Sequence, residues 1–529
     1  MKRPHCEVPT TAVRAADVLL AEDHLMARGM SMRDLRSHQA QLATDFIHGR
    51  LTSLHGAIGA KTWVLCGPNR TGEIGVLVAR NLLRLGHLIQ IYVWPGGLLG
   101  SGLKNWPWNE VSVKLHSVED ALAEIHSDDF SPPLFCVDAF FGVDDNQRMP
   151  EEVEQLAGLL CSMDLQITSI EMPSGIEVDS GRLLGKDAFC ADYTLSFSHP
   201  MPGHWLFPGR AAVGHLIVLD FDALTDSIRC HENRSIIRAN HPEHWLEHLP
   251  ERNWQRHKFH FGHFGLFVGP MIGAARMAAS SAQRVGAGMV SLICLKAQAG
   301  SLDAAVMSQM VTSFDDMDGL YRWIDVAPLT AACLGPGWPI SNSVLEVLDR
   351  ILARPVPIGL VLDASLLSSV GQLSDDEKLL FYEGIKKGVQ RGFQVVLTPH
   401  EEEFKRCFPH IDEHHHSKIH RALAAARLTG ACILLKGADT VVADPSGLCT
   451  VSASPVSHWL ATAGTGDVLS GLVGGFLAQG LSAEMAANAA VWVHGASSNR
   501  ARHFYLAEDL IPKVSEVMSD LIDRCNGSH

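Results

Sequence analysis

Short apolar runs alternate with helical segments along the whole chain, and this pattern is the first indication of its fold. In the first half, the runs that predict buried strands are 62–66, 87–93, 134–137, 166–170 and 215–219. The first of them leads into a glycine-containing turn at 67–72 and then a helix expected from about 76 to 84. Strands separated by helices are typical of a parallel, doubly wound α/β sheet.

The pattern weakens between residues 222 and 254 and then restarts. A chain of 529 residues is too long for one ordinary core, so we place a domain boundary near residue 235 and expect domains 1–235 and 236–529. A helix rich in small residues is expected at 274–284. The second half predicts strands at 265–268, 289–294, 331–334, 359–362, 394–397 and 432–435.

Composition narrows the class of protein. Hydrophobic residues make up 47% and charged residues 19%, which is typical of a globular protein, and the net charge of −15 disfavours nucleic acid as a partner. The twelve cysteines are scattered without a C-x-x-C pair, which indicates reduced thiols and a cytoplasmic location. No signal peptide is expected from the first residues, and no apolar run approaches the roughly 18 residues of a membrane helix.

The strongest chemical signal is the segment 461–471, Ala-Thr-Ala-Gly-Thr-Gly-Asp-Val-Leu-Ser-Gly. Glycines that run into a helix offer free backbone N–H groups, which suit a phosphoryl group. Asp467 would lie in the first helical turn, where it could take a proton from a substrate hydroxyl. The alternative is a plain glycine turn in which Asp467 is only a helix-terminal carboxylate.

Other strand ends in the second half carry further motifs. In their order these motifs resemble the carbohydrate-kinase-like NAD(P)H-hydrate dehydratase family over roughly residues 250 to 510. The matching residues are His257-Lys258 with Gly262, Gly273-Ala274, Gly335-Pro336-Gly337, Asp363-Ala364, Thr398-Pro399-His400 with Glu403, Lys436-Gly437 with Thr440, and the Gly464–Asp467 segment.

The resemblance implies a ribokinase-like α/β fold and ADP-dependent dehydration of (S)-NAD(P)H-hydrate, which yields AMP and phosphate. It assigns the catalytic base to Asp467 and implies Mg²⁺ with the ADP. The ADP and its phosphoryl group would be held by Lys436, Gly437, Ala438, Asp439, Thr440, Gly464, Thr465 and Gly466. The hydrated nucleotide would be held by Ala274, Gly337, His400 and Asp467.

Several positions depart from the family pattern. Phe259 stands in place of a glycine after His-Lys, and Ser365 in place of the second aspartate of D-A-D. Val456-Ser457 replaces a Gly-Asn pair, and the glycine loop 269–273 is shorter than usual. These changes bear on substrate affinity more than on phosphate chemistry.

The first half resembles the NAD(P)H-hydrate epimerase domain that is often fused to this dehydratase. Its site residues would be Thr71, Asp138, Glu171 and Ser174, with a potassium site at Thr71, Asp138 and Ser174. The family's N-N-G-G-D-G loop is replaced by residues 70–75, in which Arg70 and Thr71 stand for the asparagines, and Glu73 is expected to oppose phosphate binding. Asp138 is either an acid–base residue or a carboxylate kept in a non-catalytic fold.

We therefore expect impaired epimerase activity, with the first domain acting as a scaffold or oligomer contact. The expected partners are hydrated NADH and NADPH and a second copy of the chain, with no nucleic acid and no membrane. The alternative functions are a ribokinase-type kinase of a small vitamin-precursor alcohol and a non-catalytic binding protein.

Overall fold

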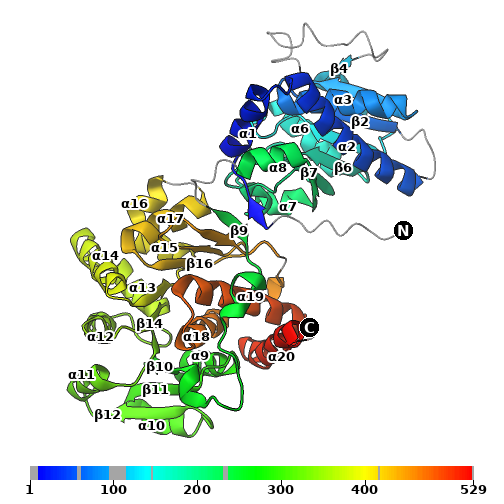
Figure 1. The fold of residues 1–529 in the computed structure, drawn as a ribbon. Coiled ribbons are helices and arrows are strands. Elements are labelled where there is room, and N and C mark those ends of the chain that lie inside the picture. Colours follow the sequence, from blue (N-terminus) through cyan, green and yellow to red (C-terminus); the bar gives the residue numbers. More distant parts are fainter. Residues whose placement is uncertain are drawn as a thin grey trace. The chain divides into compact units, whose positions relative to one another are not determined.

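The computed structural model describes residues 10–55, 61–94, 115–144, 147–229, 236–414, 417–454 and 456–526. The chain divides into two compact units, Met1–Ile237 and Arg238–His529 (Figure 1). The boundary expected near residue 235 lies outside the described residues. Among the helices that the structure describes, none is long and apolar enough to cross a membrane.

The N-terminal unit is built on a parallel sheet in the order β4-β3-β2-β5-β6-β7-β8. Its strands are β2 Lys61–Cys66, β3 Leu88–Val93, β4 Leu115–Ser117, β5 Phe135–Ala139, β6 Gln166–Ile170, β7 Tyr193–Phe197 and β8 His215–Leu219. Its helices are α1 Ala15–Ala27, α2 Met32–His55, α3 Arg70–Arg84, α5 Val118–Ile125, α6 Glu151–Cys161, α7 Gly209–Val213 and α8 Asp222–Arg229. A short strand, β1 Thr11–Ala12, precedes them.

Two sequence predictions in this unit were wrong. Helix α3 begins at Arg70 rather than near 76, because Asn69 caps it and its side-chain oxygen accepts the N–H of Gly72 at 2.9 Å. The predicted turn is therefore short, and Arg70 and Thr71 belong to the first helical turn. Strand β7 was missed because its alternation of Thr and Ser with apolar residues hides a strand that is buried almost throughout.

The C-terminal unit contains a larger mixed sheet in which the order β18-β17-β16-β15-β14-β13-β10-β11-β12 occurs. Strands β10 to β16 pair in parallel, and β17 and β18 extend them as an antiparallel hairpin. The strands are β9 Ile237–Ala239, β10 His263–Phe267, β11 Met289–Leu295, β12 Met310–Phe314, β13 Ala331–Leu334, β14 Gly359–Leu362, β15 Gln394–Leu397, β16 Cys432–Leu435, β17 Val441–Ala443 and β18 Cys449–Val451.

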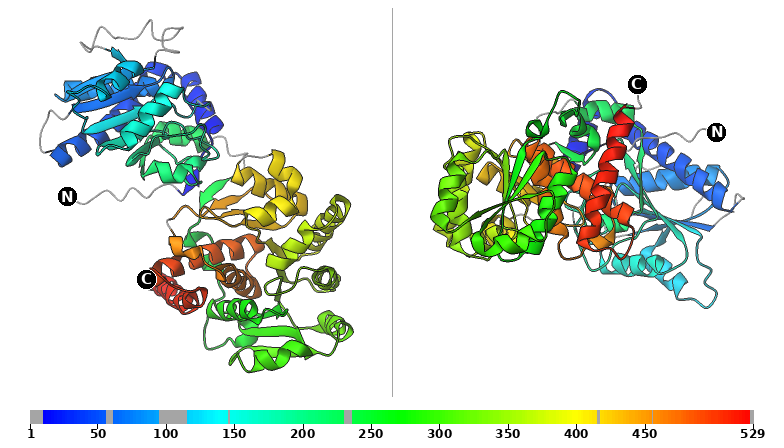
Figure 2. Two further views of the ribbon diagram at one scale, coloured as in Figure 1. Left: turned by 180° about the vertical axis from the view of Figure 1, so that it is seen from behind. Right: turned by 90° about the horizontal axis from the view of Figure 1, so that it is seen from below.

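Helices cover both faces of this sheet (Figures 1 and 2). One group is formed by α9 Ile272–Arg284, α18 Thr465–Ala478, α19 Ala483–Ala501 and α20 Ala507–Asn526. The remaining helices are α10 Lys296–Asp303, α11 Met317–Val326, α12 Asn342–Leu352, α13 Ala364–Gly371, α14 Asp375–Gln390, α15 Glu401–Cys407, α16 Pro409–His414 and α17 Lys418–Thr429. The expected fold class, two α/β domains with parallel central sheets, is confirmed.

Strand β10 is the switch point of the C-terminal sheet, since β11 follows on one side of it and β13 lies on the other. In open α/β sheets the crevice for ligands opens at the carboxyl ends of the strands beside such a point. The loops after β10, β13, β14, β15 and β16 all emerge at this edge because these strands are parallel. The motif-bearing residues are therefore brought to one edge by topology.

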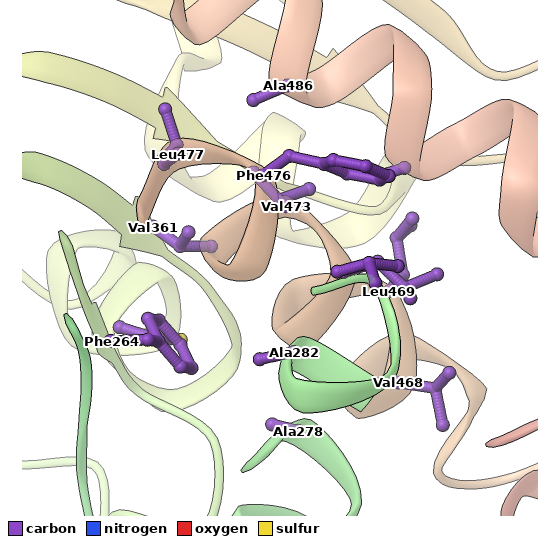
Figure 3. Packing of buried hydrophobic residues seen from close by; sticks show 14 of the residues in the cluster. Phe264, Ala278, Ala282, Val361, Val468, Leu469, Val473, Phe476, Leu477 and Ala486 are labelled. Atoms are coloured by element: carbon purple, nitrogen blue, oxygen red, sulfur yellow. The ribbon is translucent and has the colours of Figure 1, made fainter. Parts of the chain in front are cut away.

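The core of this unit lies where α9 and α18 cross against the sheet. Ala278 and Ala282 on α9 belong to one buried cluster with Val468, Val473 and Phe476 on α18 (Figure 3). Small residues allow the close approach. A Cβ on Gly471 would lie 2.0 Å from the carbonyl oxygen of Ala278. This packing fixes the direction from which α18 presents its N-terminus to the site.

Alanine at Gly471 should therefore lower the free energy of unfolding by about 1–3 kcal/mol, because one of the two helices must move. Gly384 in α14 is the matched control, since a Cβ there would meet nothing within 4 Å. Gly384→Ala should raise stability by about 0.5–1 kcal/mol. Equilibrium denaturation of both variants checks the pair, and a Gly471→Ala variant as stable as the parent would refute the close packing.

Candidate active site

Buried charges meet at the carboxyl edge of the C-terminal sheet. Lys436, which follows β16, places its Nζ 2.8 Å from Oδ1 of Asp363, which follows β14. The same Nζ lies 3.8 Å from Oε2 of Glu403, in α15 after β15. Only 2% of the Asp363 side chain and 6% of Glu403 are exposed, so this is a buried ion-pair cluster.

Asp363 is held ionised by its partners. Burial by itself raises the pKa of this carboxyl, but Lys436 and hydrogen bonds from neighbouring hydroxyls bring it below its usual value. One of these donors is Ser470 in α18, whose Oγ lies 2.6 Å from Oδ2. The pKa of Lys436 is raised: burial opposes its charge, and the carboxylates of Asp363 and Glu403 more than offset that effect. The cluster thus carries one fixed cation between carboxylates.

Asp467 lies beside this cluster in the first turn of α18 and is half-buried. Burial and the negative charge of Asp363 raise its pKa to about 6, while Lys436 acts in the opposite direction. A carboxylate with a pKa near 6 is ionised at neutral pH and still accepts a proton readily. These properties suit the general-base role that the sequence predicts for Asp467.

The turn before α18 is held by a glycine conformation and by hydrogen bonds of Thr465. Gly464 adopts φ +91, a conformation that glycine adopts without strain. The Thr465 hydroxyl donates to the carbonyls of Leu460 at 3.0 Å and Thr462 at 2.9 Å. A Cβ on Gly466 would lie 3.9 Å from Nζ of Lys436. The first N–H groups of a helix have no acceptor within it, so this turn can receive an anion close to Lys436.

His494 on α19 contacts the turn at Thr465. Its imidazole is buried and hydrogen-bonded to the backbone of Thr465, and burial lowers its pKa to about 4. It is therefore neutral at physiological pH. No role was predicted for His494, Ser470, Asp363 or Glu403, although the last three lie within motifs that the sequence shows.

The segment 436–440, expected to hold ADP, is shaped by its own side chains. Asp439 is paired with Nζ of Lys418 at 2.7 Å, and that Nζ also donates to the carbonyl of Lys436 at 3.2 Å. The Thr440 hydroxyl donates to the carbonyl of Gly437 at 2.7 Å. Both polar side chains thus brace the turn, which leaves the Gly437-Ala438 backbone as the part most suited to a ligand.

The residues expected to hold the hydrated nucleotide lie around the same edge. A Cβ on Gly337, at φ +74, would lie 3.5 Å from Cβ of Ala274, so these two residues are neighbours. His400 caps α15: its Nδ1 accepts the N–H groups of Glu402 at 3.1 Å and Glu403 at 3.3 Å. In return, Glu403 accepts the N–H of His400 at 2.9 Å. This motif therefore positions Glu403 under Lys436 and leaves the His400 ring half-exposed.

A second polar cluster lies in the N-terminal unit around Asp138, which is fully buried in β5. Its carboxylate accepts hydrogen bonds from Ser169 Oγ at 2.7 Å, Ser174 Oγ at 2.6 Å and the Ser174 N–H at 2.9 Å. Burial raises the pKa of Asp138, and these hydrogen bonds offset part of that effect. The structure thus brings Asp138 and Ser174 together.

Thr71 and Glu171 form the neighbouring pair, and Arg70 joins them. The Thr71 hydroxyl donates to Oε2 of Glu171 at 2.8 Å. Nη2 of Arg70 lies 2.9 Å from Oε1 of Glu171 and 2.6 Å from Oε1 of Glu22. Burial alone would lower the pKa of Arg70, but these two carboxylates raise it overall.

Glu73 does not act as the sequence suggested. We expected its carboxylate to oppose phosphate binding. Instead it lies 3.8 Å from Nε of Arg36, and Arg70 is neutralised by Glu22 and Glu171. The reason is the early start of α3, which turns Arg70 inward and Glu73 towards α2.

Each of the two units matches the model of a known protein family. The family model described as NAD(P)H-hydrate dehydratase matches residues 265–519, and the model of the YjeF-related protein N-terminus matches residues 33–203. A bifunctional NAD(P)H-hydrate repair enzyme from Synechocystis is 30% identical over 94% of this chain and 94% of its own length. The corresponding enzyme from Salinibacter ruber is 30% identical over 86% of this chain and 87% of its own.

Among solved structures, an ADP/ATP-dependent NAD(P)H-hydrate dehydratase from Bacillus subtilis is 26% identical, covers 54% of this chain and 98% of its own, and has a TM-score of 0.45. A ribokinase-like superfamily protein from Enterococcus faecalis is 22% identical, with 54% and 96% covered and a TM-score of 0.45.

Proposed function

Because the chain belongs to the family of bifunctional NAD(P)H-hydrate repair enzymes, we propose that its C-terminal unit uses ADP to dehydrate (S)-NADH- and (S)-NADPH-hydrate. The observation that carries this proposal is the position of Asp467. Asp467, a carboxylate with a pKa of about 6, lies in the first turn of α18. The helix N-terminus there can bind an anion, and the ammonium group of Lys436 lies close to it.

The reaction proceeds in two steps. Asp467 takes the proton of the ring hydroxyl. At the same time the hydroxyl oxygen attacks the β-phosphorus of ADP, and AMP leaves. Phosphate is then eliminated with a proton, which restores the dihydronicotinamide. One ADP and one hydrate thus give one AMP, one phosphate and one NAD(P)H. Phosphorylation is needed because hydroxide is a poor leaving group.

The surrounding residues would divide the remaining tasks. The N–H groups of the Gly464–Gly466 turn and Nζ of Lys436 would stabilise charge on the transferred phosphoryl group. The 436–440 turn would hold ADP. Ala274, Gly337 and His400 would line the pocket of the hydrated ring. Asp363, Glu403 and Ser470 would act indirectly, by fixing Lys436 and the pKa of Asp467.

Magnesium fits this site as an ion that arrives with the nucleotide. In the part of the chain that the structure describes, no group of three or more His, Cys, Asp or Glu side chains could hold a metal by itself. Mg²⁺ is commonly bound by one or two carboxylates and substrate phosphates. The ADP phosphates would bring it into the site, and it would neutralise charge on them.

We expect ADP, rather than ATP, to support turnover, since the two-domain form that this chain resembles uses ADP. The test is the initial rate of NADPH recovery from the hydrate with each nucleotide at equal concentration and in excess magnesium. A rate with ATP equal to or above that with ADP would contradict this part of the proposal.

For the N-terminal unit we propose impaired or absent epimerase activity. Its polar groups satisfy one another: Arg70 with Glu22 and Glu171, Thr71 with Glu171, and Asp138 with two serines. A phosphate would have to compete with two buried carboxylates for Arg70. The loop therefore offers an incoming phosphate little net attraction.

Potassium does not fit these residues. The Thr71 hydroxyl donates to the same Oε2 of Glu171 that the Arg70 guanidinium contacts, so a potassium ion at Thr71 would lie beside a positive charge. The Asp138 carboxylate already accepts hydrogen bonds from both serines, and the Arg70 guanidinium stands beside Glu171. We therefore assign no step to potassium.

The (R)-hydrate should then persist when it is supplied alone with ADP and excess protein. Its consumption should match its spontaneous epimerisation in a protein-free control, because only the (S) form is dehydrated. Consumption much faster than that control would show an active epimerase and refute the impairment.

Location in the cytoplasm and assembly into a homo-oligomer remain predictions from sequence.

A further inference from the structure

Two large aromatic rings lie exposed beside the C-terminal site. Trp459 belongs to a short 3₁₀ helix, His458–Leu460, and Phe504 belongs to the loop between α19 and α20 (Figure 1). Their ring centroids are 4.3 Å apart at an interplanar angle of 47°. Trp459 is 38% exposed and Phe504 84%. Contiguous exposed apolar surface is a feature of ligand and interaction sites.

Hydrogen bonds connect the two backbone segments that carry the rings. The backbone N–H of Trp459 donates to Ser457 Oγ at 3.3 Å, and the Ser457 hydroxyl donates to the carbonyl of Arg502, two residues before Phe504, at 3.3 Å. The next carbonyl after Trp459, that of Leu460, receives the Thr465 hydroxyl. The aromatic pair is thus anchored to the first residue of α18.

The Phe504 side of the pair approaches the same turn. A Cβ on Gly464 would lie 3.0 Å from Cβ of Ala507, three residues beyond Phe504. The pair therefore lies at the rim of the anion-binding turn, where the remainder of a nucleotide would extend from its phosphates.

Phe504 has a backbone conformation that disfavours a bulky side chain. Phe504 adopts φ +55 and Arg502 φ +66, a region in which a bulky side chain is strained. Burial gives no reason for phenylalanine there, because its ring is mostly in solvent. Strained residues of this kind gather at ligand sites.

We propose that Trp459 and Phe504 bind the flat base of a nucleotide whose phosphates reach the Gly464–Gly466 turn. This inference rests on the proposed function, since both proposed substrates carry an adenine ring. Stacking of a base on aromatic side chains tolerates different bases, and a tryptophan–phenylalanine pair offers the apolar area that it needs. The base can come from ADP or from the dinucleotide, and the experiment separates these sources.

The test is equilibrium binding, by calorimetry, of ADP, NADP⁺ and inorganic pyrophosphate to the full chain. NADP⁺ stands for the dinucleotide without a hydroxyl to phosphorylate, and pyrophosphate for the anion without a base. The variants are Phe504→Gly and Trp459→Leu, with Trp254→Leu as control because Trp254 is also exposed, at 89%. Glycine at 504 removes the ring and accepts the positive φ, so its melting temperature should equal or exceed that of the parent.

We expect Phe504→Gly and Trp459→Leu to weaken binding of one nucleotide about 5- to 100-fold, the range that base–aromatic stacking supports. Pyrophosphate binding should be unchanged, as should all binding to Trp254→Leu. The nucleotide that loses affinity identifies the base.

Unchanged affinity for both nucleotides would overturn the inference. So would an equal loss for pyrophosphate, which would show damage to the anion site. If Phe504→Gly instead changes the mass in solution and no affinity, the rings form a contact between copies and the inference fails. Because binding is measured without turnover, a protein that stacks nucleotides yet dehydrates nothing would refute only the proposed function.

Discussion

Asparagine in place of Asp467 should lower kcat about 10²- to 10⁴-fold, the usual contribution of a general base. The amide keeps the volume of the side chain at the start of α18 but cannot accept the proton of the substrate hydroxyl. KM for ADP should change little, because the backbone of the turn and Lys436 remain.

The fold should tolerate this change. The pKa of Asp467 is raised in the folded protein, so the fold favours its protonated form, and its ionisation costs stability as the pH rises from its usual value through about 6. A neutral amide removes that cost, so the variant should be at least as stable as the parent at pH 7 to 8. Lost activity could then not be attributed to unfolding.

Asp376→Asn is the matched control, since Asp376 lies exposed in the first turn of α14. It should retain parental activity. Steady-state kinetics of both variants decide the matter, and Asp467→Asn activity within a few-fold of the parent would show that another group is the base.

The second large effect is expected from Lys436→Met, which leaves the Asp363 carboxylate buried without its cation. Removing one partner of a buried ion pair costs about 3–5 kcal/mol of stability. Lys387→Met is the control, because Lys387 is 73% exposed and its pairing with Glu383 should be worth less than about 1 kcal/mol. Denaturant titration at neutral pH measures both.

A double variant, Lys436→Met with Asp363→Asn, separates stability from chemistry. It should regain much of the lost stability, since residue 363 no longer carries a buried charge without its cation, but should not regain activity, because the phosphoryl group still lacks its cation. Stability of Lys436→Met within about 1 kcal/mol of the parent would contradict the buried pair.

The pH profile of Lys436→Met offers a further check. Lys436 lowers the pKa of Asp467, so its removal should move the acid limb of the activity profile to higher pH. An unchanged limb would mean that Asp467 is not the titrating group.

The sequence predicted most strands of the parallel sheets because most of them are largely buried and apolar, although β6 carries Thr168 and Ser169 in its middle. Strands β6, β13, β14, β15 and β16 lie at the predicted residues. Strand β12 was missed, since Met310–Phe314 is only partly buried and carries no continuous apolar run. The hairpin of β17 and β18 was missed because each strand has only three residues.

The candidate site was predicted as a set of motifs but not as an electrostatic unit. Nothing in the sequence indicated that Lys436 pairs with Asp363, because 73 residues separate them and only the order of the strands makes them neighbours. The roles of Ser470 and His494 depend on how α18 and α19 pack. In the N-terminal unit the inward turn of Arg70 could not be foreseen, since it depends on the cap at Asn69.

The most direct test of the account is the stoichiometry of the reaction. Purified full-length protein is incubated with (S)-NADH-hydrate, ADP and magnesium, and AMP, free phosphate and recovered dihydronicotinamide absorbance are measured together. The proposed reaction should give equal amounts of AMP, phosphate and NADH, and Asp467→Asn should form none of them above background. A stable phosphate ester that accumulates without free phosphate or NADH would instead identify a kinase and contradict the account.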